Sequence, residues 1–182
     1  MPRIPYAEVS ALSDTVRTRL GTSPANVSRM LAVASEPVFQ TFGKMAGAFI
    51  NGSSLPPKLR ELAILRVGYL SDSRYETFQH EALGRFVGLS EDQISAIEAG
   101  DPSAGALDDV ESAVLEFVDD LVKNVRASDA TLSAVRDHLD DSQVVDLILV
   151  TGSYMTVCRL LETAGVELDP DPIDWNAFTQ TG

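Results

Sequence analysis

A glutamate and a histidine lie four residues apart in one predicted helix of this chain. The segment 74–87 reads RYETFQHEALGRFV, and at 100° per residue Glu76 and His80 fall one turn apart, on the edge of its apolar arc. A carboxylate at this spacing can hydrogen-bond the imidazole, raise its pKa and fix its tautomer. The pair therefore predicts a proton shuttle that works near neutral pH, and the competing interpretation is a capped, purely structural core histidine.

A second carboxylate, Glu61, lies in a predicted helix over residues 58–70 that is apolar on nearly every side. Such a helix is buried in a core or in a subunit interface. Because burying an unpaired carboxylate is costly, we expect Glu61 to be paired, protonated or at a cavity. Two interpretations stay open: a carboxylate of the same site as His80, or an ion pair with an arginine such as Arg66 or Arg159.

Two further polar groups are candidates for positioning a substrate, Arg66 and Tyr154. Tyr154 lies in a predicted helix over residues 143–164 and could present its phenol to a pocket, although a core tyrosine with a satisfied hydroxyl is the commoner case. The chain has one cysteine, Cys158, whose apolar neighbours predict a buried, inert thiol with a raised pKa. One thiol forms no internal disulfide and no Cys-rich zinc site, and the two histidines, His80 and His138, show no metal-ligand spacing. We therefore expect no metal.

The elements that must position these residues are all predicted to be helices. Helical periodicity and helix-end residues run through the chain, and no segment shows convincing strand alternation. We expect one all-α domain over residues 1–182, with a tail over residues 166–182 whose Trp175 and Phe178 dock on this subunit or on a neighbour. The predicted helices span residues 6–20, 25–34, 36–51, 58–70, 74–87, 91–99, 107–126, 129–139 and 143–164.

Charge and hydropathy exclude several classes of function. The 182 residues include 14 Lys and Arg and 27 Asp and Glu, for a formal net charge of −13. A surface this acidic repels phosphate backbones and anionic membrane surfaces. We therefore expect no nucleic-acid or membrane partner. No apolar run approaches the ~20 residues of a spanning helix, and no signal peptide is visible, which predicts a cytoplasmic protein. Helices that are apolar on every side predict a homo-oligomer.

The run LPPKLRELAILRVGYLSDSRYETFQHEALGRFVGLSEDQI resembles the carboxymuconolactone decarboxylase family, which includes the AhpD-like alkylhydroperoxidases. The matching elements are the Leu-Pro-Pro start, Arg60-Glu61-Leu62, Tyr75-Glu76-x-x-x-His80 and Gly88-Leu89-Ser90. The later run DLILVTGSYMTVCRLLETAGVELD is similar to the family's second helical segment. The resemblance covers most of residues 36–170. It implies an AhpD-like all-α fold, usually assembled as trimers or hexamers.

The resemblance also distinguishes two kinds of chemistry. Its redox members use a CxxC motif followed four residues later by a histidine, with a glutamate twelve residues before the first cysteine. In this sequence Glu61 and His80 match, but the two cysteine positions hold Ser73 and Glu76, so thiol–disulfide exchange lacks both thiols. The decarboxylase branch implies acid–base chemistry on a small carboxylated lactone without a metal or organic cofactor.

These observations predict a cofactor-independent lyase or decarboxylase-like enzyme that acts on a small organic acid or lactone. His80 is the predicted general acid and base, Glu76 orients and tunes it, and Glu61 is a second carboxylate in the same cavity. One alternative is a non-catalytic oligomeric or ligand-binding member of the family. Another is an alkylhydroperoxidase-like antioxidant protein that acts through Cys158.

Overall fold

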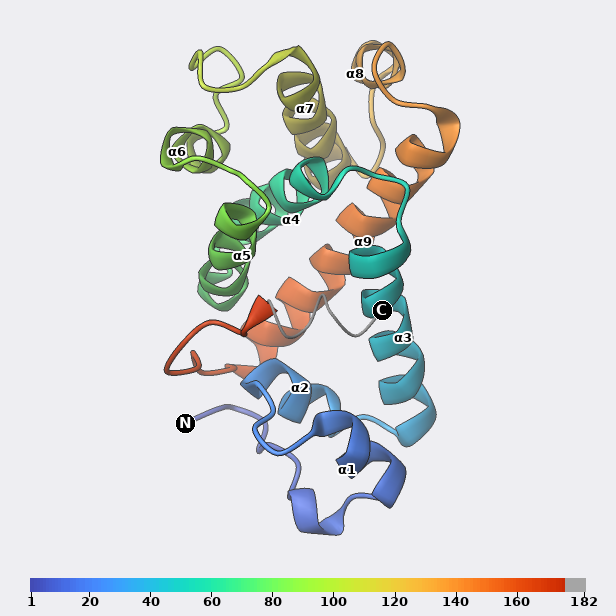
Figure 1. Ribbon diagram of the computed structural model, residues 1–182, viewed down its shortest axis with the longest axis vertical. Helices are drawn as coiled ribbons and strands as arrows, with labels where there is room; N and C mark the ends of the chain where they lie inside the picture. The colour runs from blue at the N-terminus through green and yellow to red at the C-terminus, as the bar shows by residue number, and fades with distance from the viewer. Residues whose placement is uncertain (176–182) are drawn as a thin grey trace. The chain divides into compact units, whose positions relative to one another are not determined.

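The described part of the chain, residues 1–175 of the computed structural model, contains helices and no strand, which confirms the predicted all-α class (Figure 1). A short 3₁₀ helix, η1, spans Val9–Ala11. The α-helices are α1 (Asp14–Leu20), α2 (Asn26–Leu31), α3 (Glu36–Gly52), α4 (Pro57–Leu70), α5 (Arg74–Phe86), α6 (Glu91–Ala99), α7 (Asp109–Asn124), α8 (Asp129–Arg136) and α9 (Asp141–Ala164).

Contacts along the chain divide it into two compact units. One unit comprises Ser53–Arg159 and contains α4 to α8 and most of α9. The other comprises Met1–Gly52 with Leu160–Gly182. The expectation of one domain over the whole chain stays a prediction, and each unit is described by itself.

The core of the unit Ser53–Arg159 is built around α4. Every residue of α4 from Leu59 to Gly68 is buried, as its apolar residues on all sides predict, and the helix packs against α5, α6 and α7. Its first residue is Pro57, which suits a first helical turn because the missing N–H has no partner there. A fully buried helix carries its polar side chains into the core as well.

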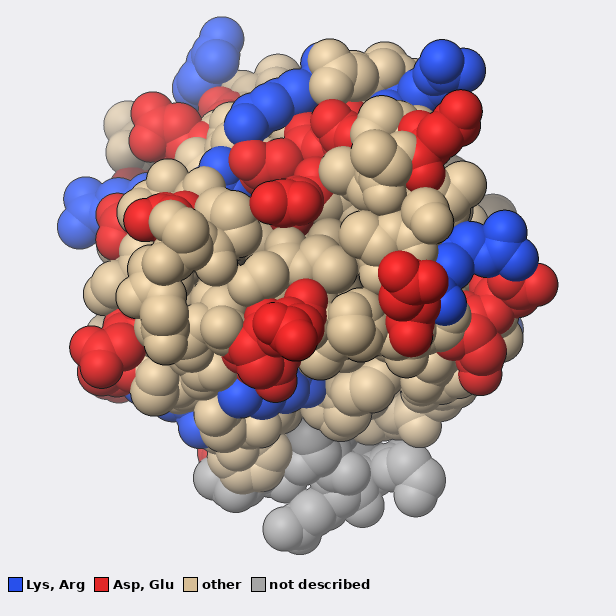
Figure 2. All heavy atoms as spheres, turned by 90° about the horizontal axis from the view of Figure 1, so that it is seen from above, with Lys and Arg blue, Asp and Glu red and all other residues tan. Residues whose placement is uncertain are grey.

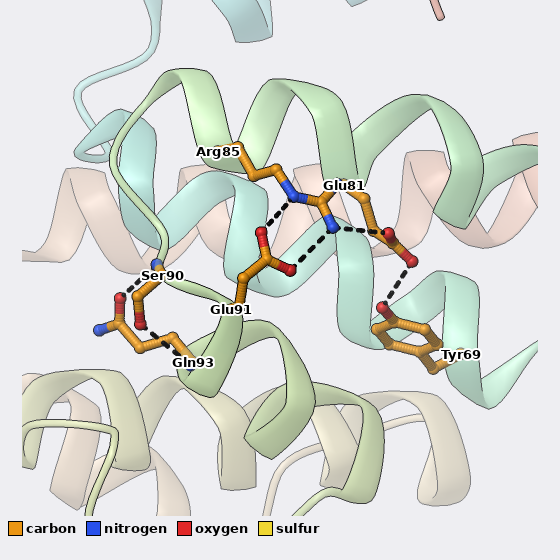
Figure 3. A network of polar contacts seen from close by, with 6 residues as sticks. All are labelled: Tyr69, Glu81, Arg85, Ser90, Glu91 and Gln93. Carbon is orange, nitrogen blue, oxygen red and sulfur yellow. Dashed lines mark hydrogen bonds and ion pairs between the residues drawn. The ribbon is translucent and has the colours of Figure 1, made fainter.

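Side-chain caps set several helix boundaries. Ser90 and Gln93 form the predicted capping box at the start of α6 (Figure 3). Asp108 and Glu111 form a second box, so α7 begins at Asp109 rather than at residue 107. The prediction of a helix over residues 6–20 was wrong at its start, because the Ser13 side chain accepts from the Val16 amide and begins α1 at Asp14.

A polar network ties α4, α5 and α6 together at the surface (Figure 3). The Tyr69 hydroxyl donates to Glu81 Oε1 at 3.1 Å, and Arg85 Nη2 donates to Glu81 Oε2 at 3.2 Å. Arg85 Nε also donates to Glu91 Oε1 at 2.6 Å. The charges of these helices are thus paired along the edge of α5 that faces away from the core.

The unit formed by Met1–Gly52 and Leu160–Gly182 has its own small core of Val16, Leu20, Ala32 and Phe39. Its two chain segments are joined where the amides of Arg3 and Ile4 donate to the Ala164 carbonyl. Trp175 is buried, as predicted for the tail, and Phe178 lies outside the described residues.

The longest helix, α9, is longer and more apolar than the expectation that no segment could cross a membrane allows. Among the described residues it is the one helix long and apolar enough to do so by length and composition, a test that core helices of soluble proteins also pass. Along one side it leaves Val145, Ile148 and Leu149 exposed. Figure 2 shows Asp and Glu side chains spread over the face that it displays, with Lys and Arg among them.

Candidate active site

Glu61 and His80 are in direct contact in the core of the unit Ser53–Arg159. Glu61 Oε2 lies 2.7 Å from His80 Nδ1, and both side chains are buried. Glu61 comes from the middle of α4 and His80 from the middle of α5, so the packing of these two helices makes the contact. A carboxylate only accepts hydrogen bonds, so the hydrogen of this contact lies on Nδ1 when Glu61 is ionised.

The ion-pair partner of Glu61 is Arg60. Arg60 Nε donates to Glu61 Oε1 at 2.9 Å, and the arginine side chain is itself buried. An ion pair with an arginine was one of the two expected interpretations, but the arginine is neither of the suggested examples, Arg66 and Arg159. Adjacent residues of a helix point about 100° apart, so sequence spacing does not single out this pair.

Glu76 lies on the other side of the imidazole ring. Its Oε1 is 3.1 Å from His80 Nε2, and among the described residues this buried oxygen has no hydrogen-bond partner of adequate geometry. Burial, and to a smaller extent the negative charge of Glu61, raise the pKa of Glu76 to about 7, while His80 lowers it. A carboxyl group with this pKa exchanges its proton near neutral pH.

The pKa of His80 is raised above its ordinary value by two opposing sets of interactions. Burial alone lowers the pKa because it disfavours the imidazolium ion. The negative charges of Glu76 and Glu61, with the hydrogen bond that His80 donates to Glu61, outweigh that effect, and Arg60 opposes them. The charged groups of Arg60, Glu61, His80 and Glu76 thus lie in one chain of contacts.

Tyr154 from α9 covers one edge of the ring of His80. The two ring centroids are 5.0 Å apart at an interplanar angle of 86°, an edge-to-face contact. Burial and the charges of Glu61 and Glu76 raise the pKa of the Tyr154 phenol well above its ordinary value, so it stays protonated near neutral pH. Cys158, one helical turn further along α9, is buried as predicted and also contributes to that rise.

Arg66 is directed away from this group. Its Nη2 donates to Asp119 Oδ2 at 3.0 Å, and its Nη1 donates to the carbonyls of Ile97 and Glu98 at 3.0 Å each. The guanidinium therefore joins α4 to α6 and α7 rather than joining the histidine. Its role in positioning a substrate stays a prediction, with no support from these contacts.

The buried face of α5 differs from the predicted one. The buried residues are Tyr75, Glu76, Gln79, His80, Leu83 and Gly84, an arc centred near Glu76. Phe86, expected in the apolar arc, is 49% exposed. Glu76 and His80 are thus fully inside, not at an edge, and Gln79 joins them on the buried face without a signal from its residue type.

The cluster is closed to solvent in this structure. The side chains of Glu61, Glu76 and His80 are 0–7% exposed. An open surface hollow lies elsewhere, between α6 and the loop over residues 101–106, with Asp92 and Asp101 in its lining. Within the part of the chain that the structure describes, no group of three or more His, Cys, Asp and Glu residues is arranged to hold a metal ion.

Comparison with known proteins supports this fold independently. The alkylhydroperoxidase AhpD core of an uncharacterized peroxidase-related protein from Ralstonia eutropha matches with a TM-score of 0.80 and 21% identity, covering 98% of this chain and 94% of that one. An uncharacterized peroxidase-related protein from Silicibacter matches with a TM-score of 0.77 and 19% identity, over 92% and 90% of the two chains. At these identities the matches show the fold alone.

The family comparison agrees with the structural one. No curated protein matches the chain significantly. The family model of the carboxymuconolactone decarboxylase family matches residues 36–120, the stretch that carries Arg60, Glu61, Glu76 and His80. Residues 36–120 are therefore similar to the carboxymuconolactone decarboxylase family, and the chain has an AhpD-like helical fold.

Proposed function

We propose that this protein is a cofactor-independent acid–base enzyme, lyase- or decarboxylase-like, that acts on a small organic acid or lactone. The observation that carries the proposal is the line of contacts from Glu61 through both nitrogens of His80 to Glu76. A histidine held between two carboxylates, one with a pKa of about 7, can take up and release a proton near neutral pH.

In the proposed mechanism His80 and Glu76 exchange the proton with the substrate. Glu61 holds the ring by Nδ1, so that proton transfer takes place at Nε2. Loss of CO₂ from a carboxylate whose α-carbon also bears a carbonyl leaves an enolate, and that α-carbon takes a proton from the His80–Glu76 pair. Opening of a lactone or elimination uses the same pair as a base and then as an acid. Because the cluster is closed, side chains must move to admit a substrate.

The residues at the motif positions support acid–base chemistry over thiol chemistry. Ser73 and Glu76 stand where redox members of the family carry cysteines, and both are buried. Glu76 instead adds a proton-carrying group next to the histidine. A cytoplasmic location, a homo-oligomeric assembly and a small-molecule substrate complete the proposal.

A second candidate function is an antioxidant role of the AhpD type. The observation that favours it is the position of Cys158, buried one turn from Tyr154, whose ring packs on His80. A thiolate there would attack a peroxide oxygen, form a sulfenic acid and release the alcohol, and an external thiol would then reduce it. A third, non-catalytic role is consistent with the closed cluster.

One panel of assays separates the three functions. The full chain and its His80→Gln and Cys158→Ser variants are incubated with small lactones and carboxylated lactones, and separately with an alkyl hydroperoxide and a thiol. Turnover of a lactone that falls at least 100-fold in His80→Gln, and is unchanged in Cys158→Ser, supports the acid–base proposal. Peroxide turnover that is lost in Cys158→Ser contradicts it and supports the second candidate. Absence of both activities favours the non-catalytic role.

A further inference from the structure

We propose that Arg60 is a positioning residue of this site, which holds the Glu61 carboxylate ionised and so decides which nitrogen of His80 carries the hydrogen. The consequence for turnover depends on the proposed acid–base function. The effect on the ring itself does not, because it follows from three buried side chains and their contacts.

The geometry joins the three residues in series. Arg60 Nε donates to Glu61 Oε1 at 2.9 Å, and Glu61 Oε2 lies 2.7 Å from His80 Nδ1. The two oxygens of one carboxylate therefore serve two different partners. All three side chains are buried, so solvent does not replace either contact. Adjacent positions of a helix point in different directions, yet the long Arg60 side chain reaches the carboxylate of the next residue, Glu61. The positive charge of the guanidinium therefore lies beside Glu61.

The charge of Arg60 determines the state of Glu61. A buried carboxylate without a cation takes up a proton because ionisation in a low dielectric is costly. With Arg60 in place Glu61 is ionised and accepts from Nδ1–H, which leaves the Nε2 lone pair of the neutral ring toward Glu76. Without that charge Glu61 becomes a carboxylic acid that donates to Nδ1, and the hydrogen of the neutral ring moves to Nε2. Arg60 thus acts on catalysis through Glu61 and never through the substrate.

Several groups besides Arg60 face the imidazole, and the test must keep them unchanged. Glu61 faces it from α4, Glu76 from its own helix, and Tyr154, with Cys158 one turn further on, from α9. Arg60→Met removes the charge and keeps a long apolar side chain in the core. Arg60→Lys keeps the charge. Lys58→Met is the matched control, because Lys58 lies on the same helix and pairs with Glu111, 2.7 Å away, instead.

The measurement is ¹⁵N NMR of the imidazoles in the full chain labelled at histidine. The chain has two histidines, and the exposed His138 is an internal reference for the buried His80. At a pH where the ring is neutral, we expect the Nδ1–H tautomer of His80 in the native protein, in Arg60→Lys and in Lys58→Met. We expect the Nε2–H tautomer in Arg60→Met, with His138 unchanged in all four proteins.

Two results would overturn the inference. One is an Nε2–H tautomer of His80 in the native protein, a reading that needs no variant. The other is an Nδ1–H tautomer that persists in folded Arg60→Met; Arg60→Gln replaces that variant if it fails to fold. On an identified lactone substrate, Arg60→Met should lower kcat on the order of 100-fold with little change in KM, and Arg60→Lys should restore it. If no substrate is turned over but the tautomer changes, the proposed function fails and the role of Arg60 stands.

Discussion

Glu61 Oε2 contacts His80 Nδ1 at 2.7 Å, although the two residues are 19 positions apart and belong to different helices. The contact exists because α4 is buried on every side and α5 packs against it with Glu76 and His80 on its buried face. A carboxylate and an imidazole buried together must satisfy each other, since neither reaches solvent.

Replacing Glu61 should weaken the fold and change the titration of His80. Glu61→Gln leaves Arg60 without its carboxylate and is expected to lower the free energy of unfolding by about 3 kcal/mol. It should also lower the pKa of His80, because the charge and hydrogen bond of Glu61 both raise that pKa. Urea unfolding and NMR titration against His138 measure the two effects. The exposed Glu116→Gln is the control and should shift stability by less than about 0.5 kcal/mol; equal losses in both variants would contradict this prediction.

Replacing Glu76 should change how stability depends on pH. Its pKa of about 7 in the folded protein lies above that of an unfolded glutamate, so the folded state binds the extra proton. Stability is therefore highest at acidic pH and falls as pH rises from about 4.5 to 7, by about 3 kcal/mol in total from this group. Glu76→Gln lacks this loss and should be the more stable protein at pH 8. If the difference in stability between the native protein and Glu76→Gln were the same from pH 5 to pH 8, the raised pKa of Glu76 would be contradicted.

Gly100 should be intolerant of a side chain. Its φ is +67°, and a Cβ there would overlap Arg66 Nη2, in the guanidinium that binds Asp119. Gly100→Ala is expected to cost about 3 kcal/mol or more, from backbone strain and from displacement of Arg66. Gly105→Ala is the control, since its φ is +72° with open space around the Cβ, and it should cost only about 1 kcal/mol. Thermal unfolding compares the two, and equal losses would show that the contact with Arg66 does not matter.

The exposed apolar side of α9 should be covered by another copy of the chain. Val145, Ile148 and Leu149 are 41–52% exposed and lie within two turns of that helix. We expect size-exclusion chromatography with light scattering to give a mass of two or more chains of 19.6 kDa each. Leu149→Lys should shift the mass toward one chain, whereas Val125→Lys, at a position 91% exposed, should not. A native mass of one chain would refute the homo-oligomer.

The sequence alone determined the helices and the identity of the candidate residues. Capping residues and apolar spacing located α6 at Glu91–Ala99 and placed α3, α4, α5 and α9 within a few residues of their observed ends, because these signals are local. The same periodicity marked Glu61 as a buried carboxylate and paired Glu76 with His80 across one turn. That Ser73 and Glu76 stand where the similar redox proteins carry cysteines also needed no structure.

Tertiary packing decided which of these residues meet. The packing of α5 directs Glu76 and His80 into the core and leaves Phe86 exposed. The apolar residues of the helix alone did not predict this orientation. It brought Glu61 into contact with Arg60 and His80. It also brought Arg66 into contact with Asp119. The reason is that a residue's spacing defines the side of its own helix, whereas a buried charge pairs with whatever group the neighbouring helix places within reach.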